Sequence, residues 1–150
     1  MLIRRMAKSV NRVHAPDALL PQMLLFTRIA TAGFFLAHAI VRIVKNTIPQ
    51  FALFMDSQGF PAPEAVVWAI TVTELVAGAL LIVGRYVRPA AAALMAIAAG
   101  GIALIHRHFG WFVGEHGTGG IEYSAALIVL LLIIIADDHD RHRGAAAPIA

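Results

Sequence analysis

The chain has 150 residues, of which 59% are hydrophobic and only 14% are charged, and its mean hydropathy is +0.76. A soluble globule of this size needs a larger polar surface, so the composition excludes an ordinary soluble domain and indicates a single membrane-embedded unit. The net charge of +3 comes from basic residues at segment ends, which excludes a nucleic-acid surface, and the absence of cysteine excludes disulfides and thiolate or iron–sulfur chemistry.

Residues 1–21 form a basic segment that carries Arg4, Arg5, Lys8 and Arg12. We expect it to be a cytoplasmic arm. A cleaved signal peptide is not expected, because Arg28 interrupts the apolar stretch that follows.

Four segments approach the ~20 apolar residues that cross a hydrocarbon core about 30 Å thick. They comprise residues 22–44, 64–84, 88–106 and 119–136. A loop rich in proline and glycine follows the first segment, and a tight basic turn at 85–89 makes the second and third antiparallel neighbours. In the third segment, Ala92, Ala96 and Gly100 lie one turn apart and would let another helix pack closely.

The predicted fold is therefore an all-α membrane protein, an antiparallel bundle of four transmembrane helices over residues 22–136. A short cytoplasmic tail follows at 137–150. Lys and Arg are retained on the cytoplasmic side of membrane proteins. If both termini lie inside, eight of these residues are on the cytoplasmic side and three are towards the outside. We expect both termini in the cytoplasm.

Ionisable residues within the spans are costly in lipid and indicate a polar interior. From the cytoplasmic end of its span, Arg28 would lie at roughly 9 Å and Glu74 at ~15 Å, at 1.5 Å per residue. Arg28 is long enough to bridge this difference, so we expect an Arg28–Glu74 ion pair that sets helix register. A proton or substrate pathway is the alternative.

A second polar group, His38, His106, Glu122 and Tyr123, is expected towards the outside of the bundle. It would suit a metal site, a proton relay, or a pocket for the headgroup of a quinone-like molecule. No metal site is predicted, because the chain lacks a His-Glu-x-x-His or Glu-x-x-His motif. Phe109 and Trp111 are expected to be interfacial anchors.

Five short segments together resemble the DoxX family of small bacterial membrane proteins, with matching order and spacing over about residues 22–136. They are Arg28 with Phe34-Phe35-Leu36-Ala37-His38, Gln58-Gly59-Phe60-Pro61-Ala62-Pro63, Thr73-Glu74-Leu75-Val76-Ala77-Gly78, Gly84-Arg85-Tyr86-Val87-Arg88-Pro89-Ala90, and Gly119-Gly120-Ile121-Glu122-Tyr123. The resemblance implies a four-helix bundle in the inner membrane of a bacterial cell. The family takes its name from a relative associated with a thiosulfate:quinone oxidoreductase.

The sequence departs from the family pattern on the first helix. The family usually has His-Gly and then Lys there, whereas this chain has His38-Ala39 and Arg42. Arg keeps the positive charge but has no titratable amine, so a role that needs deprotonation at residue 42 is not expected.

From the resemblance we expect a membrane subunit or scaffold of a quinone-linked or oxidative-stress redox system, rather than an enzyme by itself. It would bind a small lipophilic molecule, with a non-covalently bound quinone as one candidate, and would contact the lipid bilayer and an oxidoreductase partner. The candidate ligand-binding residues are His38, Arg42, Glu74, His106, Glu122 and Tyr123. Homo-oligomerisation is left open.

Two other functions are compatible with the same residues. One is a small proton-coupled carrier or permease, favoured by a carboxylate in the membrane but disfavoured by a short chain without an inverted repeat. The other is a purely structural interaction protein, in which the polar pairs only specify helix packing.

Overall fold

The computed structural model describes residues 19–113 and 119–146, and all regular structure in these ranges is helical. This confirms the all-α prediction. The helices are α2 (Leu19–Val44), α3 (Ile48–Ser57), α4 (Pro63–Val83), α5 (Val87–Leu104), the 3₁₀ turn η1 (His106–Phe109) and α6 (Ile121–Ala146). The predicted N-terminal arm lies outside the described residues, except that 19–21 form the start of α2.

Three of the described helices, α2, α4 and α5, are long and apolar enough to cross a membrane. The fourth predicted span coincides with the first part of α6. Its apolar stretch is bounded by Glu122 and Asp137, and α6 does not meet the same standard of length and composition. The structure thus supports a membrane protein with three candidate spans.

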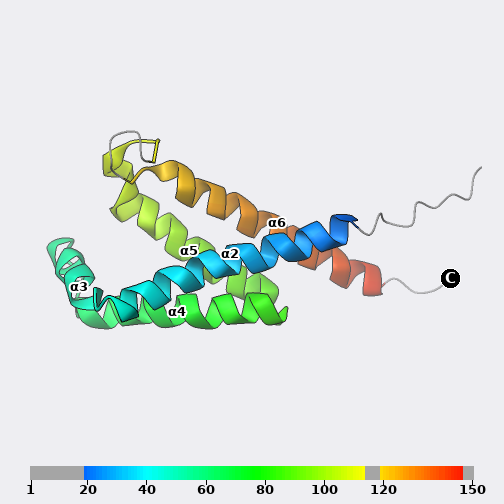
Figure 1. The fold of residues 1–150 in the computed structure, drawn as a ribbon, viewed down its shortest axis with the longest axis horizontal. Coiled ribbons are helices and arrows are strands. Elements are labelled where there is room, and N and C mark those ends of the chain that lie inside the picture. The colour runs from blue at the N-terminus through cyan, green and yellow to red at the C-terminus, as the bar shows by residue number, and fades with distance from the viewer. Residues whose placement is uncertain (1–18, 114–118, 147–150) are drawn as a thin grey trace, which may run out of the picture.

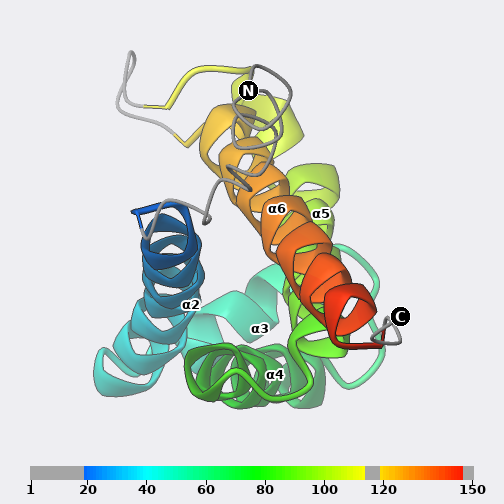
Figure 2. The same ribbon diagram turned by 90° about the vertical axis from the view of Figure 1, so that its right-hand side faces the viewer.

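The four long helices form a ring in which α2 contacts α4 and α6, while α5 contacts α4 and α6 (Figures 1 and 2). Apolar side chains fill the centre, including Ala32 and Phe35 of α2, Leu81 of α4, Leu94 of α5 and Leu131 of α6. The short helix α3 lies at one end of the ring, where it packs on α4. We call this end of the ring the α3 end. The opposite end carries the α4–α5 turn, and we call it the turn end.

Local chain geometry explains where α4 begins and ends. Pro63 occupies the first turn of the helix, where its missing N–H costs nothing. The helix ends at Gly84, whose φ of 75° is the left-handed conformation that glycine adopts without a steric penalty. Two residues later Tyr86 also has a positive φ, and α5 begins at once. The antiparallel turn predicted at 85–89 is therefore present.

Three expectations from the sequence need correction. The segment expected to be a loop between the first two spans contains α3, which begins at Ile48 and has Pro49 in its first turn, where the missing N–H costs no hydrogen bond. The Ala92, Ala96 and Gly100 stripe does not pack inside: the first two are exposed and an added Cβ at Gly100 would meet nothing within 4 Å. Finally, residues 137–146 continue α6 and do not begin a separate tail.

Candidate functional site

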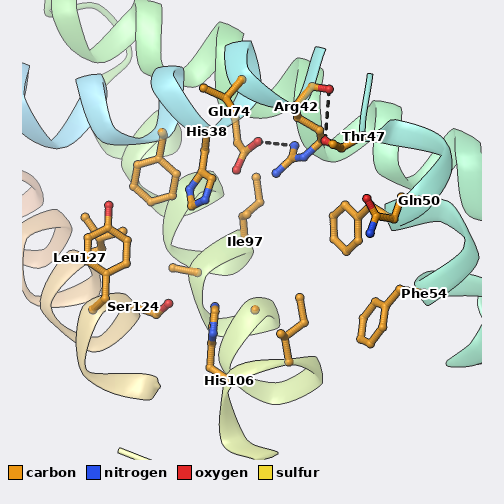
Figure 3. A pocket seen from close by; sticks show the side chains of 17 residues that line it. His38, Arg42, Thr47, Gln50, Phe54, Glu74, Ile97, His106, Ser124 and Leu127 are labelled. Carbon is orange, nitrogen blue, oxygen red and sulfur yellow. Dashed lines mark hydrogen bonds and ion pairs between the residues drawn. The ribbon is translucent and has the colours of Figure 1, made fainter. Parts of the chain in front are cut away.

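A cavity of about 500 Å³ lies among all the long helices near the α3 end of the ring (Figure 3). Its volume is within the usual range for small-molecule sites. Side chains from α2, α3, α4, α5, η1 and α6 form the wall, and most are apolar or aromatic. The polar residues of the wall are His38, Arg42, Thr47, Gln50, Glu74, His106, Tyr123 and Ser124.

An ion pair between Arg42 of α2 and Glu74 of α4 forms one side of this cavity. Arg42 Nη1 donates to Glu74 Oε2 at 2.6 Å and to Thr71 Oγ1 at 2.8 Å. Phe51 of α3 lies against the same guanidinium, 5.4 Å from ring centre to Cζ. The side chains are only 13% and 4% exposed, so each charge depends on the other for compensation.

The predicted Arg28–Glu74 pair is therefore wrong. Arg28 lies at the turn end, where a Cβ added to Gly84 would be 3.0 Å from Arg28 Nη2. Our depth estimate placed the cytoplasmic ends of the two helices level at residues 22 and 84. In the structure, residue 28 is level with Gly84, so Glu74 faces a position further along α2 that Arg42 can reach.

Two histidines face the cavity from opposite walls, His38 from α2 and His106 from η1 (Figure 3). The His106 ring lies between Gly101 and Gly119, where added Cβ atoms would be 3.5 Å and 3.6 Å from its nitrogens. Its Nδ1 is buried and has no hydrogen-bond partner among the described residues. Burial lowers the pKa of His106 below the usual 6.5, and nearby His38 lowers it further. The imidazole of His106 therefore favours its neutral form at the cavity wall, with its Nδ1 covered by neighbouring residues.

Of the remaining two candidate residues, Tyr123 lines the cavity and Glu122 does not. Tyr123 of α6 lines the cavity and packs edge-on against Phe34 of α2, with ring centres 6.3 Å apart. Glu122 is not among the lining residues; its Oε1 accepts a hydrogen bond of 2.8 Å from the Val113 backbone N–H. The cavity thus brings together five of the six candidates, while Glu122 holds the segment that precedes α6.

Sequence reasoning missed the contribution of α3 and of the hydroxyl groups. Gln50, Phe51 and Phe54 of α3 line the cavity, and Thr71 fixes the Arg42 guanidinium. The signal for α3 was present, since Pro49 at a helix start precedes aromatic residues three positions apart that share a helical face. Within 19–113 and 119–146, no three His, Asp or Glu side chains are clustered closely enough to hold a metal ion.

Comparison with known proteins gives one match. A family model described as DoxX matches residues 23–107, which is more than half of the chain. The matched range includes His38, Arg42, Glu74 and His106, whereas Tyr123 and Ser124 of the cavity lie beyond it. No curated protein and no solved structure matches the chain.

The ion pair predicts strong energetic coupling between Arg42 and Glu74. Arg42→Met or Glu74→Leu alone should lower the free energy of unfolding by about 3–5 kcal/mol, because each leaves a buried charge unpaired. The double variant should recover most of that loss. Unfolding in detergent, analysed as a double-mutant cycle, measures the coupling.

Arg28→Met combined with Glu74→Leu is the matched control, since Arg28 lies at the turn end. Its effects should be additive. Coupling of Glu74 to Arg28 but not to Arg42 would contradict the observed register.

The lowered pKa of His106 predicts that acid weakens the fold. The unfolded chain binds a proton near pH 6.5, whereas the folded chain binds it only at lower pH. The free energy of unfolding should therefore fall as the pH drops below 6.5. Above pH 6.5, proton binding by His106 should make no contribution to its pH dependence. His106→Phe should flatten the pH dependence of the melting temperature, whereas His108→Phe, at an exposed site outside the cavity, should not. Equal acid sensitivity in wild type and His106→Phe would refute the assignment.

Proposed function

The chain belongs to the DoxX family, and we propose that it is a membrane-embedded subunit or scaffold of a redox system that binds a small lipophilic molecule in the cavity near α3. The observation that carries this proposal is the cavity itself. Five polar residues from four helical segments converge on one space lined mainly by apolar side chains: His38, Arg42, Glu74, His106 and Tyr123.

The electrostatics of the wall favour an uncharged headgroup. Arg42 and Glu74 neutralise each other, and Glu74 is the only carboxylate among the described lining residues. Glu74 Oε1 makes no hydrogen bond to a described residue, so a ligand donor could use it, while His38 and Tyr123 also line the cavity. The hydroxyl of a quinol can donate to this oxygen, and the carbonyl of a quinone can accept from a histidine N–H or the Tyr123 hydroxyl.

The aromatic side chains suit the same class of ligand. Phe35, Phe51 and Phe54 line the cavity and offer apolar faces to a planar ring. A neutral, mostly apolar ligand would also enter from the bilayer without the desolvation cost of an ion.

For the arrangement in the membrane we propose four spans with both termini in the cytoplasm, and α6 as the fourth. Val129, Leu132 and Ile133 of α6 are exposed on the outside of the ring, where lipid would cover them. Two of the acidic residues in its C-terminal half are compensated, since Asp137 pairs with Arg141 at 2.9 Å and Asp138 with Arg88 at 3.1 Å. Compensation reduces the cost of placing this helix at the membrane edge.

Reporter fusions test this topology. A fusion after Gln50 should be active outside, and fusions after Arg85 and Arg143 inside, because the α4–α5 turn and the C-terminal region carry the retained basic residues. An outside signal at Arg143 would exclude α6 as a fourth span.

Ligand binding is tested by thermal stabilisation in detergent. A ubiquinone analogue with a decyl tail should raise the melting temperature of the wild type, and a concentration of 100 Kd corresponds to about 2.7 kcal/mol of stabilisation. His38→Phe keeps the bulk of the ring but removes the nitrogens that could bond to a ligand, so it should melt like the wild type without the analogue and respond weakly to it. His108→Phe should respond like the wild type.

Each outcome selects one function. Absence of a shift in the wild type would remove the ligand from the proposal and favour a structural scaffold. A wild-type shift together with proton-driven uptake of the analogue into proteoliposomes would favour the carrier. A redox subunit should also co-purify with an oxidoreductase in mild detergent.

A further inference from the structure

We propose that the turn end of the bundle binds an anionic phospholipid, with the phosphate at the α4–α5 turn and an acyl chain in the groove between α4 and α5. This site is separate from the cavity near α3 and does not rest on the proposed redox role. In the proposed topology it would face the cytoplasmic leaflet.

The headgroup part is a cavity of about 440 Å³ at the turn. Residues 84–89 form one wall, and Asp138 and His142 of α6 form the other. Arg85 makes no ion pair with a described carboxylate and lies over the Tyr86 ring, 5.4 Å from its centre. Arg88 pairs with Asp138 at 3.1 Å, but its side chain is 48% exposed and keeps donors for a second partner.

The helix termini add to the positive potential at this cavity. The 18-residue helix α5 begins at Val87 with no side-chain cap and no acidic residue in its first turn, so its backbone donors and the positive end of its dipole are uncompensated. The Arg28 guanidinium lies against Gly84, which also lines the cavity. Its Nε is buried and has no hydrogen-bond partner in the described structure. Asp138 is the only carboxylate among the described lining residues, so the cavity favours an anion.

An apolar groove continues from the same place. It has a volume of about 360 Å³ and runs between Val76 and Leu80 of α4 and Ala90 and Ala93 of α5. Tyr86 and Pro89 line both cavities, so the polar and apolar spaces are adjacent. Free phosphate would occupy only the polar space. A phospholipid has a phosphate for the polar space and an acyl chain for the apolar groove. Basic pockets between helices at the membrane surface suit anionic headgroups.

Native mass spectrometry of the full chain in detergent tests this site with two long-chain lipids, phosphatidylglycerol and phosphatidylcholine. The anionic lipid should be retained more strongly. Arg85→Gln should weaken its binding about fivefold, the effect of one arginine near an anionic headgroup. Arg107→Gln, the same change at an exposed arginine of η1, should leave binding unchanged, and both variants should melt like the wild type.

The groove is tested with Ala93→Phe, which fills it. This variant should lose affinity for long-chain phosphatidylglycerol but keep its weak affinity for the dihexanoyl form, which needs little of the groove. Equal retention of phosphatidylglycerol and phosphatidylcholine, or equal losses in Arg85→Gln and Arg107→Gln, would overturn the site. Binding of inorganic phosphate as strong as that of the lipid would overturn the acyl-chain part.

Discussion

The Arg42–Glu74 ion pair is the interaction on which the rest of the structure depends. Both side chains are largely buried in a bundle with a lipid-facing exterior, so neither charge can remain unpaired. Their contact therefore constrains the position of α2 along α4. At the other end of α4, the close approach of Arg28 to Gly84 agrees with the same register. Between them, Gly78 leaves room for Leu36 so that the two helices can approach closely.

This register determines the chemistry of the cavity. With Arg42 held by Glu74 and Thr71, the strongest charges are satisfied within the protein and do not require an ionic ligand. The opposite wall is provided by His106, whose lowered pKa keeps it neutral. The result is a polar space between aromatic side chains whose carboxylate and guanidinium are paired with each other, in keeping with the neutral lipophilic ligand proposed for it.

The two ends of the bundle differ in how their charges are compensated. Near α3, the guanidinium of Arg42 is paired with a carboxylate of the neighbouring helix. At the turn end, Arg28 and Arg85 lack carboxylate partners among the described residues, and the uncapped start of α5 adds to their potential. A neutral ligand at one end and an anionic lipid at the other would therefore use different parts of the same four-helix ring. The α3 helix belongs only to the first site.

The sequence by itself determined the all-helical membrane fold, the family and most of the polar residues that meet in the cavity, because hydropathy, charge and short motifs are local properties of the chain. It did not determine which residues pair. Arg28 was assigned to Glu74 from depth alone, the Ala92 stripe was expected inside, and Glu122 was expected to bind ligand rather than the Val113 backbone. Each of these depends on how far one helix is shifted and rotated against another. Only the tertiary structure decides that, because packing and charge pairing between helices set both quantities together.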